Sequence, residues 1–109
     1  MDKKSKKMVY DKQAEILKAL AHPVRIAILD FLKDGEQCVC HIAEYVASER
    51  SNVSKHLSIM VNCGILESRK EGLNMYYSLK AKCILGFFDC ITNCIKQQAN
   101  DNIKLLKAI

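Results

Sequence analysis

Residues 38–64 read CVCHIAEYVASERSNVSKHLSIMVNCG, and their apolar spacing is the most informative feature of the chain. Apolar residues recur at helical spacing both before and after a polar break at residues 48–50. The first set is Val39, Ile42, Ala43 and Val46, and the second is Val53, Leu57, Met60 and Val61. Gly64 follows the second set as a helix stop. The stretch therefore predicts two short helices joined by a tight turn, the second over residues 51–63, in the arrangement of a helix-turn-helix.

The sequence before this stretch predicts two more helices. Apolar spacing indicates one helix over residues 10–20. Pro23 suits the first turn of the next helix, where its missing N–H costs no hydrogen bond, and Gly35 ends that helix. The lysine-rich residues 1–9 are expected to form a frayed, flexible basic arm.

The sequence after the stretch changes character. Strand-like residues 66–70 and 75–79 flank residues 71–74, which predicts a β-hairpin with a four-residue loop. An apolar stripe then follows a last helix from residue 84 to about residue 99, with a weaker continuation over residues 103–106.

One small core cannot cover that stripe in a monomer, so two copies are expected to pair through a dimerisation helix within residues 80–109. The predicted fold class is mainly α with a small β-hairpin. It is a winged helix-turn-helix, with one domain over residues 1–109 that forms a homodimer through its terminal helices.

Composition narrows the function classes. Lys and Arg number 17 against 12 Asp and Glu, and the resulting charge of +5 favours phosphate-bearing partners. No apolar run approaches the roughly 20 residues that span a bilayer, and no signal-peptide pattern follows Met1, so a cytoplasmic location is expected. The six cysteines lie mostly in helical patterns rather than in loops, which favours reduced thiols that bind or react over a disulfide scaffold.

The predicted DNA-binding residues are polar or basic side chains on the second helix of the motif and on the hairpin. Arg and Asn form bidentate contacts with base edges, while Ser and Lys suit phosphates. The alternative for the helix is an ordinary solvated face. The expected partner is double-stranded operator DNA with an inverted repeat, since a dimer sets its two reading helices about 34 Å apart. The predicted contacts are Arg50, Ser51, Asn52, Ser54, Lys55, His56, Arg69, Lys70 and Asn74.

Five motifs in this order resemble the ArsR/SmtB family of metal-responsive repressors. They are LKALAHPVRI at 17–26, CVCHIA at 38–43, VSKHL at 53–57, GIL at 64–66, and YYSL at 76–79 preceded by Gly72. The resemblance covers about residues 10–97. It implies a dimeric winged helix-turn-helix that reads DNA with the helix over residues 51–63. One departure is Glu49, where the family usually has Ser or Thr, with Ser48 before it in place of an apolar residue.

The resemblance also indicates where a metal site would lie. Cys38 and Cys40 match the cysteine pair with which many members bind soft ions, and soft thiolates prefer such ions. On a regular helix these two positions point about 200° apart, so chelation is expected to require a loosened helix start. A third ligand is missing from the motif because Ala43 stands where some relatives have another cysteine. His41 is a candidate, although a surface or capping role suits it better.

The last helix carries a second set of candidate metal ligands, Cys83, Cys90 and Cys94. Spacings of seven and four residues put these thiols along one helix edge. The resemblance places Cys83 and Cys94 where zinc-sensing relatives have histidine ligands, and here it favours a softer ion than zinc. Inert packing at a dimer seam is the alternative for these thiols, and it is the preferred interpretation for Cys63.

The function predicted from these features is a metal(loid)-sensing repressor that leaves DNA when thiolates bind a soft ion. As(III) or Sb(III) is favoured and Cd(II) or Pb(II) is possible, with no organic cofactor. A thiol redox- or persulfide-responsive repressor of the same fold is the alternative. A thiol enzyme is disfavoured because the sequence has no Cys-x-x-Cys and no nucleophile motif.

Overall fold

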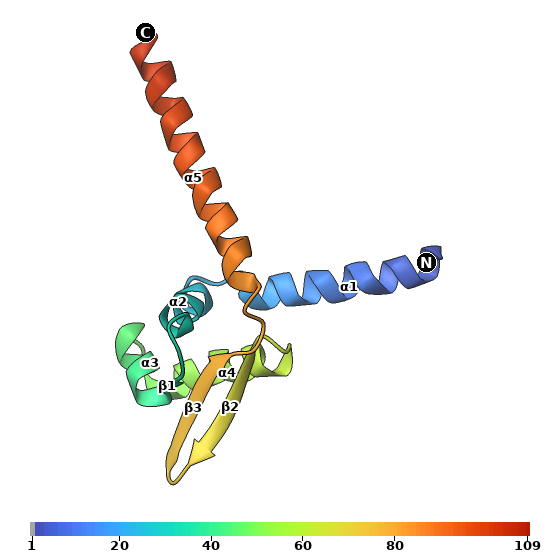
Figure 1. Cartoon of the computed structure of the whole chain (residues 1–109), viewed down its shortest axis with the longest axis vertical. Coiled ribbons are helices and arrows are strands. Elements are labelled where there is room, and N and C mark those ends of the chain that lie inside the picture. The colour runs from blue at the N-terminus through green and yellow to red at the C-terminus, as the bar shows by residue number, and fades with distance from the viewer. Residues whose placement is uncertain (1) are drawn as a thin grey trace.

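The computed structural model describes residues 2–109, and over that range helices predominate (Figure 1). The elements in chain order are α1 (Lys3–Leu20), α2 (Pro23–Leu32), β1 (Gln37–Cys38), α3 (Val39–Tyr45), α4 (Arg50–Asn62), β2 (Leu66–Glu71), β3 (Asn74–Leu79) and α5 (Ile84–Lys107). The mainly α class with a small hairpin is confirmed, and so are the two short helices of the central motif.

The core forms where α2, α3, α4 and the base of the sheet meet. Its centre consists of the predicted apolar positions, and Ile28, Ile42 and Leu57 are fully buried there. Burying each such side chain contributes about 1.5–3 kcal/mol. This packing fixes α4 against α3, and the turn between them passes through Ala47, whose φ is 50°.

The three strands form one antiparallel sheet in the order β1–β3–β2. Strands β2 and β3 pair from Leu66 opposite Leu79 to Glu71 opposite Asn74. The hairpin loop therefore has two residues, Gly72 and Leu73, instead of the four predicted, and Gly72 takes the positive φ that a tight turn requires. The short strand β1 was not predicted, because two residues carry no recognisable alternation.

The start of α1 corrects one prediction. Residues 3–9, expected to be a frayed arm, are the first turns of a helix, while Met1 lies outside the described residues. Asp2 caps this helix by accepting a hydrogen bond from the backbone N–H of Ser5 at 2.8 Å. Lysine is a good helix former, and Lys7 pairs with Asp11 one turn later at 3.6 Å.

Helices α1 and α5 extend away from the core in different directions, and the β2–β3 hairpin points away from α5 (Figure 1). Helix α5 continues to Lys107, beyond the predicted end near residue 99. Within one chain no residue of α5 is buried, and apolar side chains on both helices remain exposed. Within the described range, no helix is both long and apolar enough to cross a membrane.

Candidate nucleic-acid interface and thiol pair

Helix α4 presents its first turns to solvent. Arg50, Ser51, Asn52, Ser54 and Lys55 are all exposed, as a helix that enters a groove requires. The residue before the helix, Glu49, has an extended backbone, and its side chain makes no capping hydrogen bond. Asn52 Nδ2 instead donates to Ser48 Oγ at 3.0 Å. The backbone N–H groups at this end therefore stay available to an anion such as a DNA phosphate.

His56 differs from the other predicted contacts on α4, because it is half-buried against α2. Its Nδ1 accepts a hydrogen bond from Arg25 Nε at 3.0 Å, and its ring lies 4.5 Å from that of His22. Burial, His22 and Arg25 together lower the pKa of His56. His56 therefore packs between the middle of α4 and α2 and is less accessible than the other predicted contacts, and its role in DNA binding stays a prediction.

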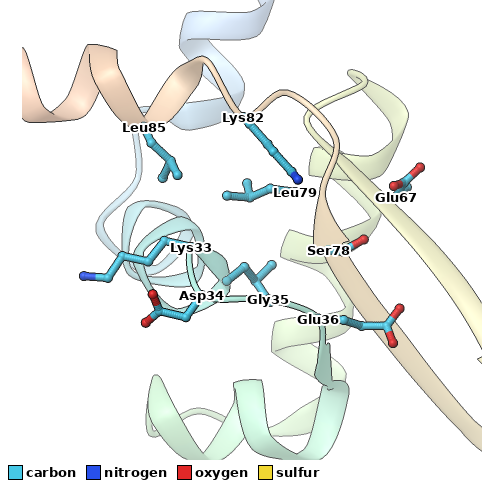
Figure 2. Close-up of a pocket in the computed structure, with 10 residues that line it drawn as sticks. Lys33, Asp34, Gly35, Glu36, Glu67, Ser78, Leu79, Lys82 and Leu85 are labelled. Atoms are coloured by element: carbon cyan, nitrogen blue, oxygen red, sulfur yellow. The ribbon is translucent and has the colours of Figure 1, made fainter.

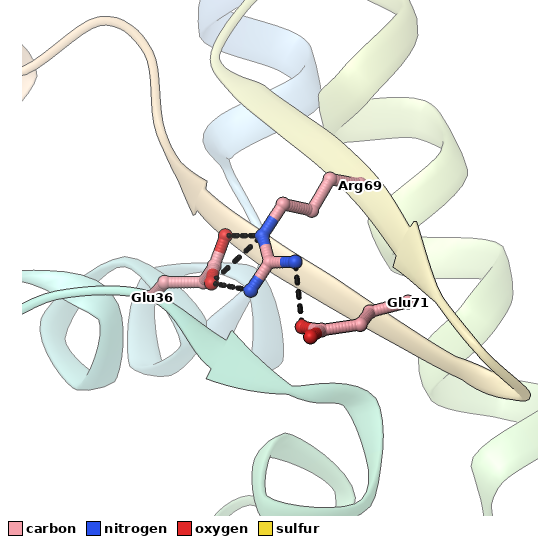
Figure 3. Close-up of polar contacts among 3 residues, drawn as sticks. All are labelled: Glu36, Arg69 and Glu71. Atoms are coloured by element: carbon pink, nitrogen blue, oxygen red, sulfur yellow. Dashed lines mark hydrogen bonds and ion pairs between the residues drawn. The ribbon is translucent and has the colours of Figure 1, made fainter.

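The hairpin, or wing, carries the remaining predicted contacts. Lys70 and Asn74 are exposed on it. Arg69 is also on the surface, but Figure 3 shows its guanidinium held between two carboxylates. Arg69 Nη2 and Nε donate to Glu36 at 2.7 and 2.9 Å, and Nη1 donates to Glu71 at 2.7 Å. The hydrogen bond from Arg69 lowers the pKa of Glu36, and both carboxylates raise the pKa of Arg69.

The thiols of Cys38 and Cys40 converge at the start of α3, with their sulfur atoms 2.6 Å apart. Cys38 is the N-cap residue and has an extended backbone, so the 200° divergence of a regular helix does not apply to this pair. The expectation that the helix must loosen before both sulfurs reach one ion is therefore wrong. Cys38 is buried and Cys40 is exposed, which gives the pair access to solvent from one side.

The surroundings of the pair favour one thiolate. The Cys40 thiol and the Cys40 and His41 backbone N–H groups hydrogen-bond to the Cys38 sulfur and lower the pKa of Cys38, with a smaller contribution from the charge of Arg50. The same contact, in which Cys40 supplies the proton, raises the pKa of Cys40. Thiolate is the form that binds metals, so the pair is chemically suited to a soft cation.

Cys83 is the N-cap residue of α5, Cys90 and Cys94 lie in the first half of the helix, and all three are exposed. Cys90 and Cys94 are one turn apart, about 6 Å along the axis, whereas Cys83 is about 10 Å from Cys90. Between residues 2 and 109, no three His, Cys, Asp or Glu side chains come close enough to hold a metal ion. A triplet site within one chain is therefore not formed, and neither His41 nor another side chain completes the Cys38–Cys40 pair.

The hollow in Figure 2 is a separate feature of about 360 Å³ between the end of α2, strand β3 and the start of α5. Its lining contains lysines and carboxylates in mixture, and no cysteine or histidine. It therefore offers no soft ligand, and its mixed charge does not match a phosphate backbone.

Helices α3 and α4 with the β2–β3 wing define the class of winged helix-turn-helix proteins, which bind DNA. The profile of the bacterial regulatory proteins of the arsR family matches residues 22–68. An uncharacterized HTH-type transcriptional regulator of Methanocaldococcus jannaschii is 43% identical over 70 residues, which are 62% of this chain and 79% of the relative. The chain belongs to the arsR family.

Two other relatives are named for resistance to cadmium or to arsenicals. A cadmium resistance regulatory protein CadC homolog of Staphylococcus aureus is 42% identical over 67 residues, which are 61% of this chain and 55% of that protein. An arsenical resistance operon repressor of Staphylococcus xylosus is 35% identical over 72 residues, which are 66% of this chain and 69% of that protein.

Solved structures agree with the fold. The crystal structure of Mycobacterium tuberculosis Rv0081 has a TM-score of 0.77 at 30% identity, covering 87% of this chain and 96% of that one. The solution structure of a homodimeric winged helix-turn-helix DNA-binding domain from Mycobacterium bovis has a TM-score of 0.79 at 27% identity and covers 93% of both chains. The predicted winged helix-turn-helix is confirmed.

Proposed function

We propose that this protein is a transcriptional repressor that binds operator DNA as a homodimer and leaves it when the Cys38 and Cys40 thiolates capture a soft metal or metalloid ion. The observation that carries the proposal is the convergence of the two sulfurs at the N-terminus of α3. Helix α3 packs directly against α4, so a change at the thiols acts on the helix that carries most of the proposed DNA contacts. Release by an inducer requires such a difference in binding free energy between two states.

The DNA contacts in this proposal are the exposed residues of α4 and of the wing. Arg50 and Asn52 suit base edges, and Lys55 and Lys70 suit phosphates. Ser51, Ser54 and Asn74 are small or polar enough to allow close approach. Arg69 contacts DNA only if its carboxylate partners release its guanidinium. His56 accepts a hydrogen bond from α2 and so holds α4 in position.

As(III) and Sb(III) are the favoured inducers, and Cd(II) and Pb(II) are also suited to thiolates. The similarity to a cadmium resistance regulator and an arsenical resistance repressor supports this class of ion. Two sulfurs leave such an ion short of a full set of ligands. We infer that a further ligand comes from outside the pair, either from a small thiol in solution or from a cysteine of α5 across the dimer.

Operator affinity measured against each ion tests the proposal. The probe is a duplex selected by the reduced protein from a random library, and its affinity is followed by fluorescence anisotropy. As(III), Sb(III), Cd(II), Pb(II) and Zn(II) are each titrated. A soft ion is expected to weaken binding about 5- to 150-fold, the usual range of allosteric coupling.

Serine variants assign the site. The pair variant Cys38→Ser/Cys40→Ser is expected to bind the duplex and ignore the ion. The matched control is Cys63→Ser, because the Cys63 thiol lies apart from both groups and donates to the carbonyl of Met60 at 3.4 Å. The variant Cys83→Ser/Cys90→Ser/Cys94→Ser shows whether α5 supplies a ligand. Release of a fully cysteine-free variant by the same ions would contradict ion sensing by thiols.

The alternative of a redox- or persulfide-responsive repressor draws on the same sulfur contact, because two thiols this close are also suited to form a disulfide. Counting free thiols before and after mild peroxide treatment, with operator affinity measured in parallel, separates the two. Loss of two thiols together with DNA release, and no response to any ion, would favour the redox mechanism.

A further inference from the structure

The wing is joined to the thiol-bearing segment by the side chain of Arg69. Its guanidinium makes hydrogen bonds to both oxygens of Glu36, at 2.7 Å from Nη2 to Oε1 and 2.9 Å from Nε to Oε2 (Figure 3). Glu36 precedes β1 and Arg69 lies in β2, so the contact bridges elements 33 residues apart in sequence. A bidentate ion pair of this kind fixes the relative orientation of the two side chains as well as their distance.

The register of the sheet aligns this ion pair with the thiols. Cys38 in β1 lies opposite Tyr76 in β3, and Tyr76 lies opposite Arg69 in β2. The three residues therefore form one row across the sheet and project from the same face. The Arg69 guanidinium lies over the Tyr76 ring, 4.8 Å from its centroid. Glu36 is two residues before Cys38, so strand alternation gives it the same side of the sheet.

Cys38 thus takes part in two structures at once. It is the N-cap of α3, and it is also the last residue of the strand that pairs with the wing. A backbone shift at Cys38 would therefore act on Glu36, two residues earlier, and on the β1–β3 pairing together.

We propose that Glu36 and Arg69 are positioning residues that link the Cys38–Cys40 pair to the wing, so that ion capture changes wing orientation as well as helix α3. The proposal rests on the proposed function in taking this pair as the sensor. It assigns the wing an active part in release, with the Glu36–Arg69 ion pair as the connection.

The test compares the response ratio, defined as operator affinity without As(III) divided by operator affinity with saturating As(III). Glu36→Gln keeps the shape of the side chain and removes its charge. This variant is expected to lower the response ratio about two- to fivefold, the size that the free energy of an exposed ion pair allows. Its As(III) affinity, measured from thiolate absorbance without DNA, is expected to match that of the unsubstituted protein.

A double-mutant cycle separates a link from two independent effects. Arg69→Gln and Glu36→Gln/Arg69→Gln are each expected to show the same reduced response ratio as Glu36→Gln. Each variant removes the same ion pair, so the effects of the two substitutions do not add. The matched control is Asp30→Asn, which removes the exposed Lys33–Asp30 pair of 3.2 Å at the end of α2, and its ratio is expected to stay unchanged. A merely structural loss would instead lower operator affinity equally with and without As(III).

Two results distinguish failure of this inference from failure of the proposed function. If the unsubstituted protein does not release DNA in As(III) or any other soft ion, the proposed function fails and the link with it. If the unsubstituted protein releases DNA and Glu36→Gln releases it to the same degree, the sensor stands and the link through the wing is overturned.

Discussion

At the scale of single residues, the contact among His22, Arg25 and His56 shows how the start of α2 holds α4 in position. Arg25 also donates from Nη1 to the carbonyl of Ala19 at 3.0 Å, so one side chain ties the end of α1 to α4. Arg25 Nε donates to His56 Nδ1, and this nitrogen must be unprotonated to accept the hydrogen bond. The position of the DNA-reading helix therefore depends on a neutral imidazole.

Acidification is expected to destabilise the protein through His56. Its folded-state pKa is lowered, mainly by burial, from an unfolded value of 6.5. The unfolded chain then binds more protons between the two pKa values, so the stabilisation is complete above about pH 6.5 and is lost as the pH falls through the lowered pKa. Urea unfolding at pH 7.5 and at pH 5.5 measures this loss. His56→Gln is expected to show a smaller difference between the two pH values, and an equal difference would contradict the role of His56.

The sequence shows readily which residues of α4 are exposed. It does not show which distant residues form hydrogen bonds with one another. Exposure of Arg50, Asn52 and Lys55 follows from the apolar spacing of their neighbours. Arg25, which donates to His56, lies 31 residues away from it, and Glu36, which accepts from Arg69, lies 33 residues away, so no local pattern contains that information. A resemblance identifies the Cys38–Cys40 motif, but the convergence of its sulfurs depends on a cap conformation that helical geometry alone does not predict.

At the scale of elements, helix ends decide how the central motif is built. Helix α4 ends in a Schellman motif, in which the Ile65 N–H bonds the Met60 carbonyl at 3.0 Å and the Gly64 N–H bonds the Val61 carbonyl at 3.0 Å. Gly64 has a φ of 82°. This ending turns the chain directly into β2, so it sets the angle between α4 and the wing.

Two glycines provide a matched pair of substitutions. An added Cβ meets no neighbouring atom within 4 Å at either Gly64 or Gly86. Gly64→Ala is nevertheless expected to destabilise the fold by about 1–2 kcal/mol, because its left-handed φ disfavours any residue with a Cβ. Gly86→Ala, inside helix α5, is expected to stabilise by about 0.5–1 kcal/mol. Urea unfolding measures both, and a shift of the same sign for the two variants would show that backbone conformation is not the cause.

The helices that sequence reasoning recovers are those with a repeated apolar period, namely α2, the central helices and α5, and the hairpin is recovered from strand-like residues on both sides of a turn. The start of α1 was mispredicted because its lysines give no apolar period, while its stability comes from the Asp2 cap and an ion pair along the helix. Strand β1 was missed because its two residues become a strand only through pairing with Tyr76 and Tyr77.

At the scale of the whole molecule, α1 and α5 leave a large apolar surface exposed, and the proposed homodimer would pair through it. Phe87, Ile91 and Ile95 lie one turn apart on α5, and 44%, 38% and 61% of their surfaces are exposed. Beside Phe87 and Ile91, residues of α1 and α2 line an almost wholly apolar hollow of about 290 Å³. In the homodimer proposed above, a second copy of the chain paired through the same helices would bury this surface on both sides of a two-fold axis.

Charge placed on this surface is expected to separate the dimer and weaken DNA binding together. Ile91→Asp/Ile95→Asp would bury carboxylates in the proposed dimer interface, so the variant is expected to sediment as a monomer while keeping its helical circular dichroism. Operator affinity is expected to fall about a hundredfold or more, because each monomer then engages one half-site without the avidity of the pair. The control Asn93→Asp adds charge about 200° around the helix from Ile91, and it is expected to remain a dimer. A monomeric variant with undiminished operator affinity would mean that one copy of the reading helix and wing is sufficient, and dimerisation would then have no part in operator recognition.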